Sequence, residues 1–396
     1  MAAFVALGCL AAFQLNAGGS NVRGIAIAKS TVQSSHLTPL AQAVDRPRPK
    51  DLRKRELRQA SSNRHLLIGY WQTFVNNAAI IPLSQVSGQY DVINVAFGMP
   101  APGTAATISL SIDPSIESMD QFTSDIAGLH GRGKIVLLSI GGASAPIKLD
   151  TERKVKKFVK SVTTLVHQYS FDGIDIDFEG NSVKLGPGDT DFKSPTTPAI
   201  VNLISALHTI KHTFGAGFKI SFAPSTFSLQ GGFSNYGGEQ GSYLPVIYGT
   251  RDILSWVQTQ DYDSGTMFGL DGNIYTGGTA DFHVAMTEFL LNGFAVAHNS
   301  SQIFPPLEQS QVAFGVPASI QAASTTPPSF ATPTDVQNSL NYLINGVPYS
   351  GHQYTLLNPA GYHGMLGVMT WSINWDVTNL SAMSNQLGPF LHAQSY

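Results

Sequence analysis

The chain has 396 residues, of which 43% are apolar and only 12% charged, and it contains a single cysteine. The length and apolar content suffice for one large barrel or for two domains. Because that cysteine, Cys9, lies near the N-terminus, the sequence excludes a disulfide framework, a cysteine-type metal site and a thiol nucleophile in the folded body. The net charge is −3, but ten basic and three acidic residues lie in 1–64, which leaves −10 for residues 65–396. This acidic body argues against a nucleic-acid partner and favours a neutral substrate.

Residues 1–17 form an apolar run of about the length of a secretory hydrophobic region, ending in small residues near Ala17. We interpret it as a signal peptide, although no positively charged region precedes it. Residues 18–64 are basic and rich in Ser, Arg, Gln and Pro, which predicts a disordered propeptide or linker. The dibasic Lys54-Arg55 fits a propeptide cleavage site and a solvated linker equally well. No later stretch reaches the ~18 unbroken apolar residues of a membrane span. From the apolar leader and the change of charge at residue 64, we expect a secreted, extracellular protein.

From His65 onward, short β-rich runs alternate with helical ones. We predict eight strands, at 65–74, 90–97, 134–141, 171–179, 218–225, 256–262, 311–316 and 366–373. Between them, 155–166 and 201–210 have the apolar spacing of amphipathic helices, the second following Pro198 at a helix start. Eight strands, each followed by a helix, predict the α/β class and a (β/α)8 TIM barrel that fills residues 65–396 as one catalytic domain.

The fourth predicted strand carries an unusual acidic face. At the two-residue period of a strand, Asp175, Asp177 and Glu179 share one face and apolar side chains fill the other. In a parallel sheet covered on both sides, these carboxylates point into the interior, where unpaired charges cost several kcal/mol each. Such a cluster indicates acid chemistry at the C-terminal mouth of the barrel, and a solvated edge strand is the alternative. Alternate residues of one strand stand ~7 Å apart and cannot alone close around a metal ion, so we expect no metal and no cofactor.

Other strand ends carry polar and aromatic candidates. A lone buried aromatic residue is more often core than site, but several that converge on carboxylates at one barrel mouth reverse that expectation. Aromatic rings beside acids suit sugars, whose apolar faces stack while their hydroxyls form hydrogen bonds. We predict that these residues, from the first, second, sixth and eighth strands, contact the substrate: Tyr70, Phe97, Gln260, Tyr262, Asp263 and Trp371.

The residues also resemble a known family. Residues 172–179, Asp-Gly-Ile-Asp-Ile-Asp-Phe-Glu, resemble the D-x-x-D-x-D-x-E signature of family 18 glycoside hydrolases, the chitinases and their relatives. Three further segments are similar to motifs of that family. Residues 139–142 are similar to its strand-three S-x-G-G motif, residues 260–265 to its strand-six Q-x-Y-N-S-G motif, and residues 369–376 to its strand-eight Trp motif. The resemblance spans about residues 65–390 and is greatest to compact bacterial-type chitinases without an inserted α+β domain.

The chain departs from the pattern of the compact family members at two positions. Ser225 stands where they carry a substrate-binding glutamate after Ala-Pro, and Asp263 stands where they carry asparagine. Both departures bear on substrate affinity and on the pH dependence of activity, and neither removes the catalytic acid.

The resemblance implies a chitinase that hydrolyses β-1,4-N-acetylglucosamine linkages with retention, using the substrate's own acetamido group as nucleophile. Glu179 would protonate the glycosidic oxygen and later activate water. Asp177 would orient the acetamide and stabilise the oxazolinium intermediate, and Tyr262 would hydrogen-bond the acetamide oxygen. Asp175 would hold the side chain of Asp177 in place and repel its negative charge, because the two carboxyl groups cannot both ionise cheaply. Trp371 would form the floor under the scissile sugar.

Two other functions stay open. An endo-β-N-acetylglucosaminidase of glycoprotein glycans would share the acidic strand. A chitinase-like lectin would hold sugar without cutting it; such proteins usually lose the final glutamate, which Glu179 retains, but Ser225 and Asp263 favour weak activity. In each case we expect a monomer whose partners are chitin or N-acetylglucosamine oligosaccharides.

Overall fold

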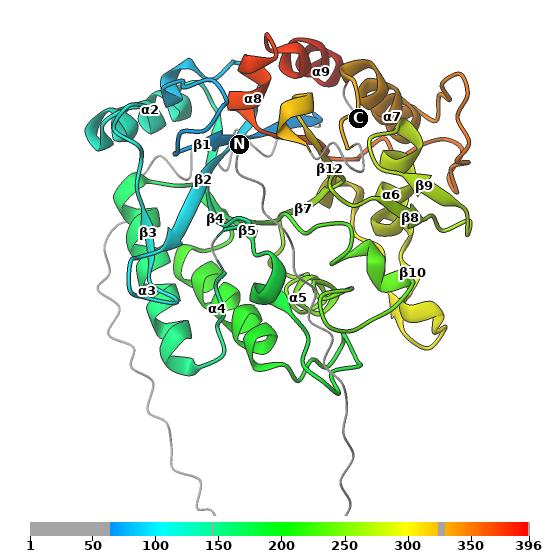
Figure 1. Ribbon diagram of the computed structural model, residues 1–396, viewed down its shortest axis with the longest axis horizontal. Helices are drawn as coiled ribbons and strands as arrows, with labels where there is room; N and C mark the ends of the chain where they lie inside the picture. Colours follow the sequence, from blue (N-terminus) through cyan, green and yellow to red (C-terminus); the bar gives the residue numbers. More distant parts are fainter. Residues whose placement is uncertain (1–63, 145, 324–328, 395–396) are drawn as a thin grey trace, which may run out of the picture. The chain divides into compact units, whose positions relative to one another are not determined.

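The computed structural model describes residues 64–144, 146–323 and 329–394. Eight parallel strands form its centre: β1 (Leu66–Gln72), β2 (Val92–Pro100), β4 (Ile135–Gly141), β5 (Gly173–Asp177), β6 (Lys219–Phe222), β7 (Trp256–Gln260), β12 (Val312–Pro317) and β13 (Gly367–Trp371). They pair in this order, and β13 also pairs with β1, which closes the barrel (Figure 1). Each strand coincides with one predicted run, so the predicted TIM barrel is confirmed. The predicted signal peptide and, except for Arg64, the basic segment lie outside the described residues.

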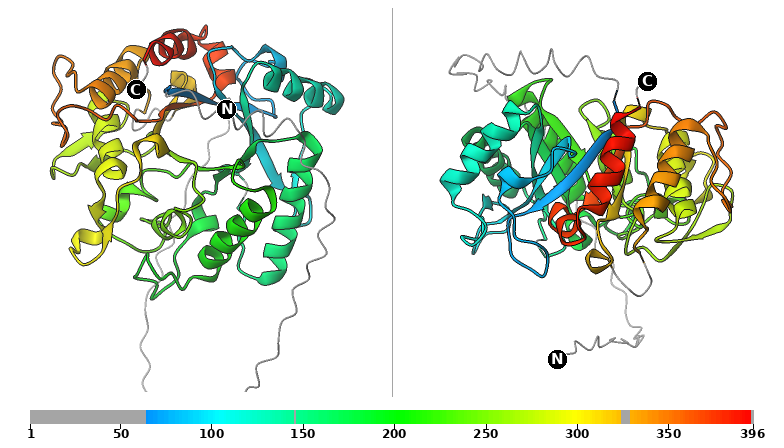
Figure 2. Two further views of the ribbon diagram at one scale, coloured as in Figure 1. Left: turned by 180° about the vertical axis from the view of Figure 1, so that it is seen from behind. Right: turned by 90° about the horizontal axis from the view of Figure 1, so that it is seen from above.

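Helices surround the strands on all sides (Figure 2). They are α2 (Met119–Gly131), α3 (Glu152–Tyr169), α4 (Pro198–Phe214), α5 (Leu244–Gly249), α6 (Ala280–Asn292), α7 (Pro333–Asn345), α8 (Ile373–Thr378) and α9 (Ala382–His392). The two predicted helices lie within α3 and α4, and α4 begins at the expected proline. The hydroxyl of Thr151 accepts the backbone N–H of Lys154 and caps α3.

Several short elements lie in the loops between the barrel strands and their helices. Strand β3 (Ile108–Leu110) pairs antiparallel with β2, and two hairpins, β8 (Thr266–Phe268) with β9 (Ile274–Thr276) and β10 (Phe294–Ala295) with β11 (Ile303–Phe304), precede and follow α6. Short 3-10 turns occur at Leu83–Gln85, Gly180–Val183, Gln230–Phe233, Val296–His298, Gln309–Gln311 and Ile320–Ala322. Between β12 and β13, the described residues contain only the last of these turns and α7, so they hold no inserted α+β domain.

The hydrophobic core has two parts. A small cluster that includes Ile68, Leu137 and Met369 fills the barrel interior, and a larger one fills the space between strands and helices. In β5 the two-residue period sends Ile174 and Ile176 into the outer core. The intervening residues therefore face the interior.

Five of the predicted strands end two or three residues earlier than their sequence runs, and two of these bear on the candidate site. Strand β5 ends at Asp177 instead of Glu179, and β7 ends at Gln260 instead of Tyr262. After Gln260 the backbone N–H of Asp261 still donates to the carbonyl of Gly315 at 3.0 Å, and Asp263 then adopts a left-handed conformation with φ of 55°. Glu179, Tyr262 and Asp263 thus lie just beyond the ends of β5 and β7, whereas the other candidate site residues lie within strands.

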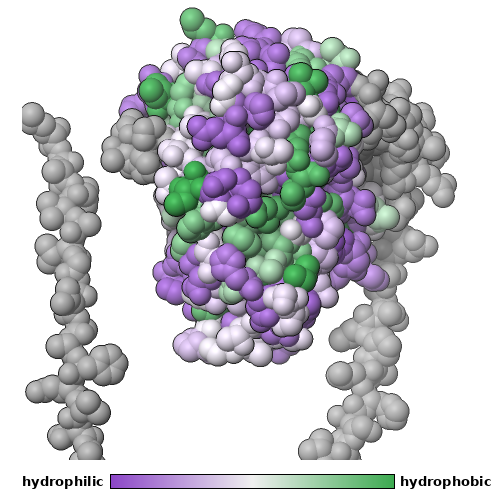
Figure 3. All heavy atoms as spheres, turned by 90° about the vertical axis from the view of Figure 1, so that its right-hand side faces the viewer, coloured by the Kyte–Doolittle hydropathy of each residue, from purple (hydrophilic) through white to green (hydrophobic). Residues whose placement is uncertain are grey.

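The surface of the described residues is mixed in character. In the side view of Figure 3, exposed hydrophobic side chains form small patches between hydrophilic ones. Scattered apolar residues of this kind are usual on a protein surface. Within residues 64–394, as far as they are described, no helix combines the length and apolar character needed to cross a bilayer.

Candidate active site

The acidic strand rises through the barrel toward its C-terminal mouth. Asp175 is completely buried, Asp177 is 3% exposed, and Glu179, two residues beyond, is partly exposed. The predicted interior position is correct for the first two carboxyl groups, and the third lies at the mouth. The three groups therefore form a ladder from the core to solvent.

Asp175 accepts hydrogen bonds from four buried side chains. Strand register places Ser139 and Ser221 beside it on the neighbouring strands, and both hydroxyls donate to it at 2.8 Å. The hydroxyl of Tyr70 donates at 2.7 Å, and Nε2 of Gln258 donates at 3.1 Å. Burial raises the pKa of Asp175 to about 6, while these donors lower it because they favour the ionised form. Asp175 is thus equipped to carry a negative charge inside the barrel.

Asp177 has a poorer set of partners. Nε2 of Gln260 donates to it at 2.8 Å, and the same nitrogen donates to the carbonyl of Ala223 at 3.1 Å. Burial, followed by the charges of Glu179 and Asp175, holds the pKa of Asp177 well above its usual range. The carboxyl group of Asp177 is therefore one that tends to stay protonated.

Glu179 also has a raised pKa, for which burial is the main cause. A hydrogen bond from Gln260 lowers this pKa, and the charge of Asp263 raises it. A carboxyl group that stays protonated at higher pH while it reaches solvent can donate a proton to a bound molecule. Asp263 itself is exposed, and its backbone N–H donates to Oγ of Ser329 at 2.9 Å.

Aromatic rings form one wall of the mouth. The ring centroids of Phe97 and Trp371 lie 5.7 Å apart with planes 19° apart, and Tyr70 meets Trp371 edge-on at 5.6 Å. Phe74, which the sequence did not single out, stacks on Phe97 at 6.4 Å and is 37% exposed. Tyr262 and Trp371 pack against the inner core and remain partly exposed. This wall can offer an apolar face to a sugar ring.

The hydroxyl of Tyr262 lies in an acidic environment. Burial, followed by the charges of Asp177 and Glu179, raises the pKa of Tyr262, so the hydroxyl stays protonated as a hydrogen-bond donor. Among the described residues, no group of three His, Cys, Asp or Glu side chains could hold a metal ion. The site is built for proton transfer and hydrogen bonding by side chains.

Tyr243 is a site residue that sequence reasoning missed. Its side chain is 1% exposed, and its hydroxyl accepts the backbone N–H of Phe178 at 2.9 Å and donates to the carbonyl of Phe178 at 2.8 Å. The pairing of β5 with β6 ends at Ile176 and Phe222. Beyond this point, the hydroxyl of Tyr243 takes the place of β6 as the hydrogen-bond partner of the backbone. It fixes the backbone between Asp177 and Glu179.

Ser221 and Gln258 were also missed, although a sequence signal for both exists. Gln258 shares the parity of Gln260 and Tyr262 on its strand, and Ser221 faces the interior on the strand beside β5. Ser225, where a carboxylate was expected from the resemblance, lies beyond β6 with its Oγ 3.0 Å from Oγ of Ser228. The structure brings the predicted residues together along the carboxyl ladder and at the mouth of the barrel above it: Tyr70, Phe97, Asp175, Asp177, Glu179, Gln260, Tyr262, Asp263 and Trp371.

Comparison with known proteins gives consistent matches. The family model described as "Glycosyl hydrolases family 18" matches residues 66–227. Chitinase D of Niallia circulans is 49% identical over 331 residues, which are 83% of this chain but only 62% of that protein. A probable class II chitinase of Arthroderma benhamiae is 39% identical over 307 residues, covering 74% of this chain and 90% of the relative. The crystal structure of a family GH18 chitinase from Chromobacterium violaceum has a TM-score of 0.74 and 36% identity, covering 83% of each chain.

Proposed function

The chain belongs to glycosyl hydrolase family 18, and from this premise we propose that it is a chitinase that cleaves β-1,4 linkages between N-acetylglucosamine units of chitin and chitooligosaccharides. One observation carries the proposal: a ladder of three carboxyl groups rises through the barrel and ends in a partly exposed glutamate of raised pKa, Glu179, beside an aromatic wall. The names of the similar proteins support the choice of chitin as substrate.

The first step is protonation of the leaving group. Glu179 gives its proton to the glycosidic oxygen, and the bond between that oxygen and the anomeric carbon breaks. Asp177 is a poor nucleophile, because it is 3% exposed, holds a hydrogen bond from Gln260 and has a raised pKa. The acetamide oxygen of the substrate therefore attacks the anomeric carbon and forms an oxazolinium ion.

The surrounding residues stabilise this ion. Asp177 accepts the acetamide N–H, the hydroxyl of Tyr262 donates to the acetamide oxygen, and Trp371 supports the sugar from below. The charge of Asp175, held by its four donors, raises the pKa of Asp177 and so regulates where the ladder keeps its proton. Water then attacks the anomeric carbon from the side that the leaving group left, the bond between that carbon and the acetamide oxygen breaks and restores the acetamido group, and Glu179 accepts the proton of the water. Two inversions give net retention.

The decisive experiment is hydrolysis of chitooligosaccharides by the purified full chain, with the anomeric form of fresh products read by NMR. We expect β products, and no cleavage of fully deacetylated oligosaccharides, which lack the nucleophile. Initial α products, or equal cleavage of deacetylated chains, would contradict the mechanism. Binding without cleavage would favour a lectin, and cleavage of glycoprotein glycans in preference to chitin would favour an endo-β-N-acetylglucosaminidase.

We also propose that the protein is exported and acts as a monomer outside the cell. The apolar residues 1–17 would direct export, and the basic residues 18–64 would serve as a propeptide or linker ahead of the barrel. The acidic charge of residues 65–396 supports a neutral polysaccharide as substrate instead of a nucleic acid.

A further inference from the structure

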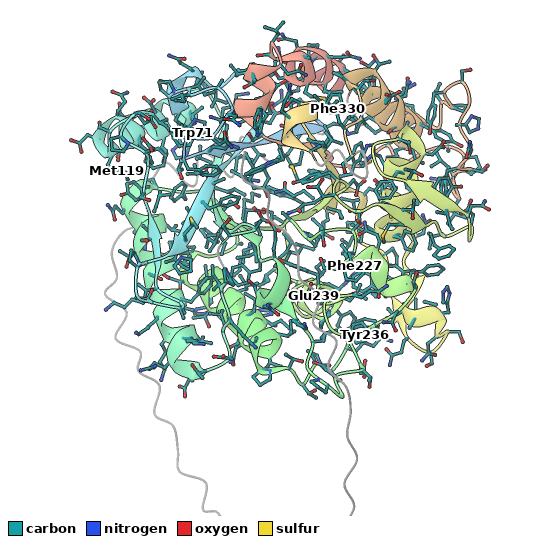
Figure 4. All side chains as sticks on the ribbon, in the orientation of Figure 1. Trp71, Met119, Phe227, Tyr236, Glu239 and Phe330 are labelled. Atoms are coloured by element: carbon teal, nitrogen blue, oxygen red, sulfur yellow. The ribbon has the colours of Figure 1, made fainter. Side chains whose placement is uncertain are left out.

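A pocket lies on the outer side of the catalytic acid, between the loops that follow β5 and β6. Its empty volume, which includes the open solvent at its entrance, is ≈ 360 Å³, so it is a shallow depression that can hold only part of a sugar ring. Figure 4 shows two of its side chains, Phe227 and Glu239, close together near α5. The residues that line it are Phe178, Glu179, Gly180, Val183, Ser225, Phe227, Ser228, Glu239 and Ser242.

The pocket has the features of a built sugar site. Phe227 is 46% exposed, which leaves a large ring free to stack on an apolar sugar face. Ser242 is 1% exposed, and its Oγ has no hydrogen-bond partner. A buried hydroxyl without a partner is costly, so a ligand that completes its hydrogen bonding is favoured here. The backbone N–H of Leu185 donates to the carbonyl of Gly238 at 2.7 Å and ties the two loops together beside Glu239.

The position of the pocket identifies which sugar it receives. It shares Glu179 with the catalytic centre, but Asp177, Tyr262 and Trp371, the residues of the acetamide side, do not line it. A catalytic acid lies between the two sugars whose bond it protonates. A pocket that touches the acid and not the acetamide residues is therefore the place of the leaving-group sugar.

Charge distinguishes this pocket further. Its lining contains two acidic side chains, Glu179 and Glu239, and no basic one. Glu239 pairs with Lys184, but their closest atoms lie 3.6 Å apart and the side chains are 41% and 49% exposed respectively. Such exposed pairs contribute only about 0–1 kcal/mol, so a bound cation can compete with the lysine.

We propose that Glu239 makes this pocket selective for a leaving-group sugar with a free ammonium group, that is, a glucosamine unit of partly deacetylated chitin. The inference rests on the proposed function, because it assigns specificity to the leaving-group side of the same reaction. It is chemically compatible with substrate assistance, which requires an acetamido group only on the sugar whose anomeric carbon reacts. The preferred bond then joins N-acetylglucosamine to a following glucosamine.

The test is digestion of partly acetylated chitosan by the full chain at an acidic pH where the amine is charged. The ratio of glucosamine to N-acetylglucosamine at newly formed non-reducing ends is measured by mass-spectrometric sequencing. We expect Glu239→Gln to lower this ratio about two- to fivefold, and Lys184→Gln to raise it, since the competing cation is gone. Glu152→Gln, which breaks a comparable exposed pair with Lys156 on α3, is the matched control and should leave the ratio unchanged.

The outcomes separate the two proposals. An unchanged ratio in Glu239→Gln, while chitooligosaccharides are still cleaved, overturns the inference and leaves the proposed function standing. An equal fall in Glu152→Gln also overturns it, because the effect would then follow net charge instead of the pocket. If the wild-type chain cleaves neither chitosan nor chitooligosaccharides, both proposals fail.

Discussion

Replacing Tyr243 by phenylalanine tests whether the end of the acidic strand is held by one hydroxyl. The substitution keeps the ring, which packs edge-on against Phe222 with centroids 6.2 Å apart, and deletes the oxygen that pairs with Phe178. The backbone N–H and C=O of Phe178 both lose this partner. Each buried polar group left unpaired costs about 1–3 kcal/mol, so we expect a loss of about 2–4 kcal/mol in the free energy of unfolding after local relaxation.

The same change should reduce turnover, because Phe178 connects Asp177 to Glu179. A misplacement of catalytic groups by about 1 Å can cost on the order of a hundredfold, so we expect kcat to fall about ten- to a hundredfold with a smaller change in KM. The readouts are urea unfolding and steady-state kinetics on a chitooligosaccharide.

The chain supplies a matched control in Tyr342 of α7. Its hydroxyl donates to the carbonyl of Tyr354 and accepts the N–H of Leu356, each at 3.3 Å, but this pairing holds a loop outside the site. Tyr342→Phe should destabilise the fold and leave kcat unchanged. The reasoning is refuted if Tyr243→Phe matches the wild type in stability, and its catalytic part is refuted if both variants lose stability while keeping full turnover.

Three other changes follow from the site. Glu179→Gln should keep the fold and lower kcat at least about a hundredfold, the scale of losing a general acid; full turnover in the folded variant would remove Glu179 from this role. In Asp263→Asn, the new asparagine tolerates the positive φ of position 263 as aspartate does. The substitution removes the negative charge that raises the pKa of Glu179. Since the acid works when protonated, a lower pKa should move the alkaline limb of kcat/KM to lower pH, by less than about one unit because Asp263 is exposed; a limb that stays or moves upward speaks against this repulsion. Finally, mass spectrometry of native protein should find an N-terminus beyond residue 17, and an intact Met1 on protein inside the cell would contradict export.

The parts of the site that lie on strands were accessible to sequence reasoning, because a strand has a fixed period. The alternation along 171–179 is enough to send Asp175 and Asp177 inward, and the same parity argument extends to Ser221 and Gln258. Their convergence on a single carboxyl group depends on strand register across the barrel, which no local pattern specifies.

The loop residues could not be found in this way. Tyr243 reaches Phe178 across 65 positions, and Glu239 reaches the pocket because Leu185 bonds the loop of Gly238. Loops have no period, so their path is set by tertiary contacts that form only in the folded chain. The proposed specificity of the leaving-group pocket is for this reason invisible in the sequence motifs that identify the family.

The four donors to Asp175 have a consequence for how the barrel assembles. They come from four different strands, β1, β4, β6 and β7, and two of them, Tyr70 and Gln258, also bond each other although they are 188 positions apart. A half-formed barrel that lacks any of these strands leaves a charged oxygen in the interior with an incomplete set of partners. Detachment of a single strand is therefore disfavoured, and the protein is expected to open as a unit. Asp175, through these donors, therefore also couples the early and late halves of the chain into one cooperative unfolding transition.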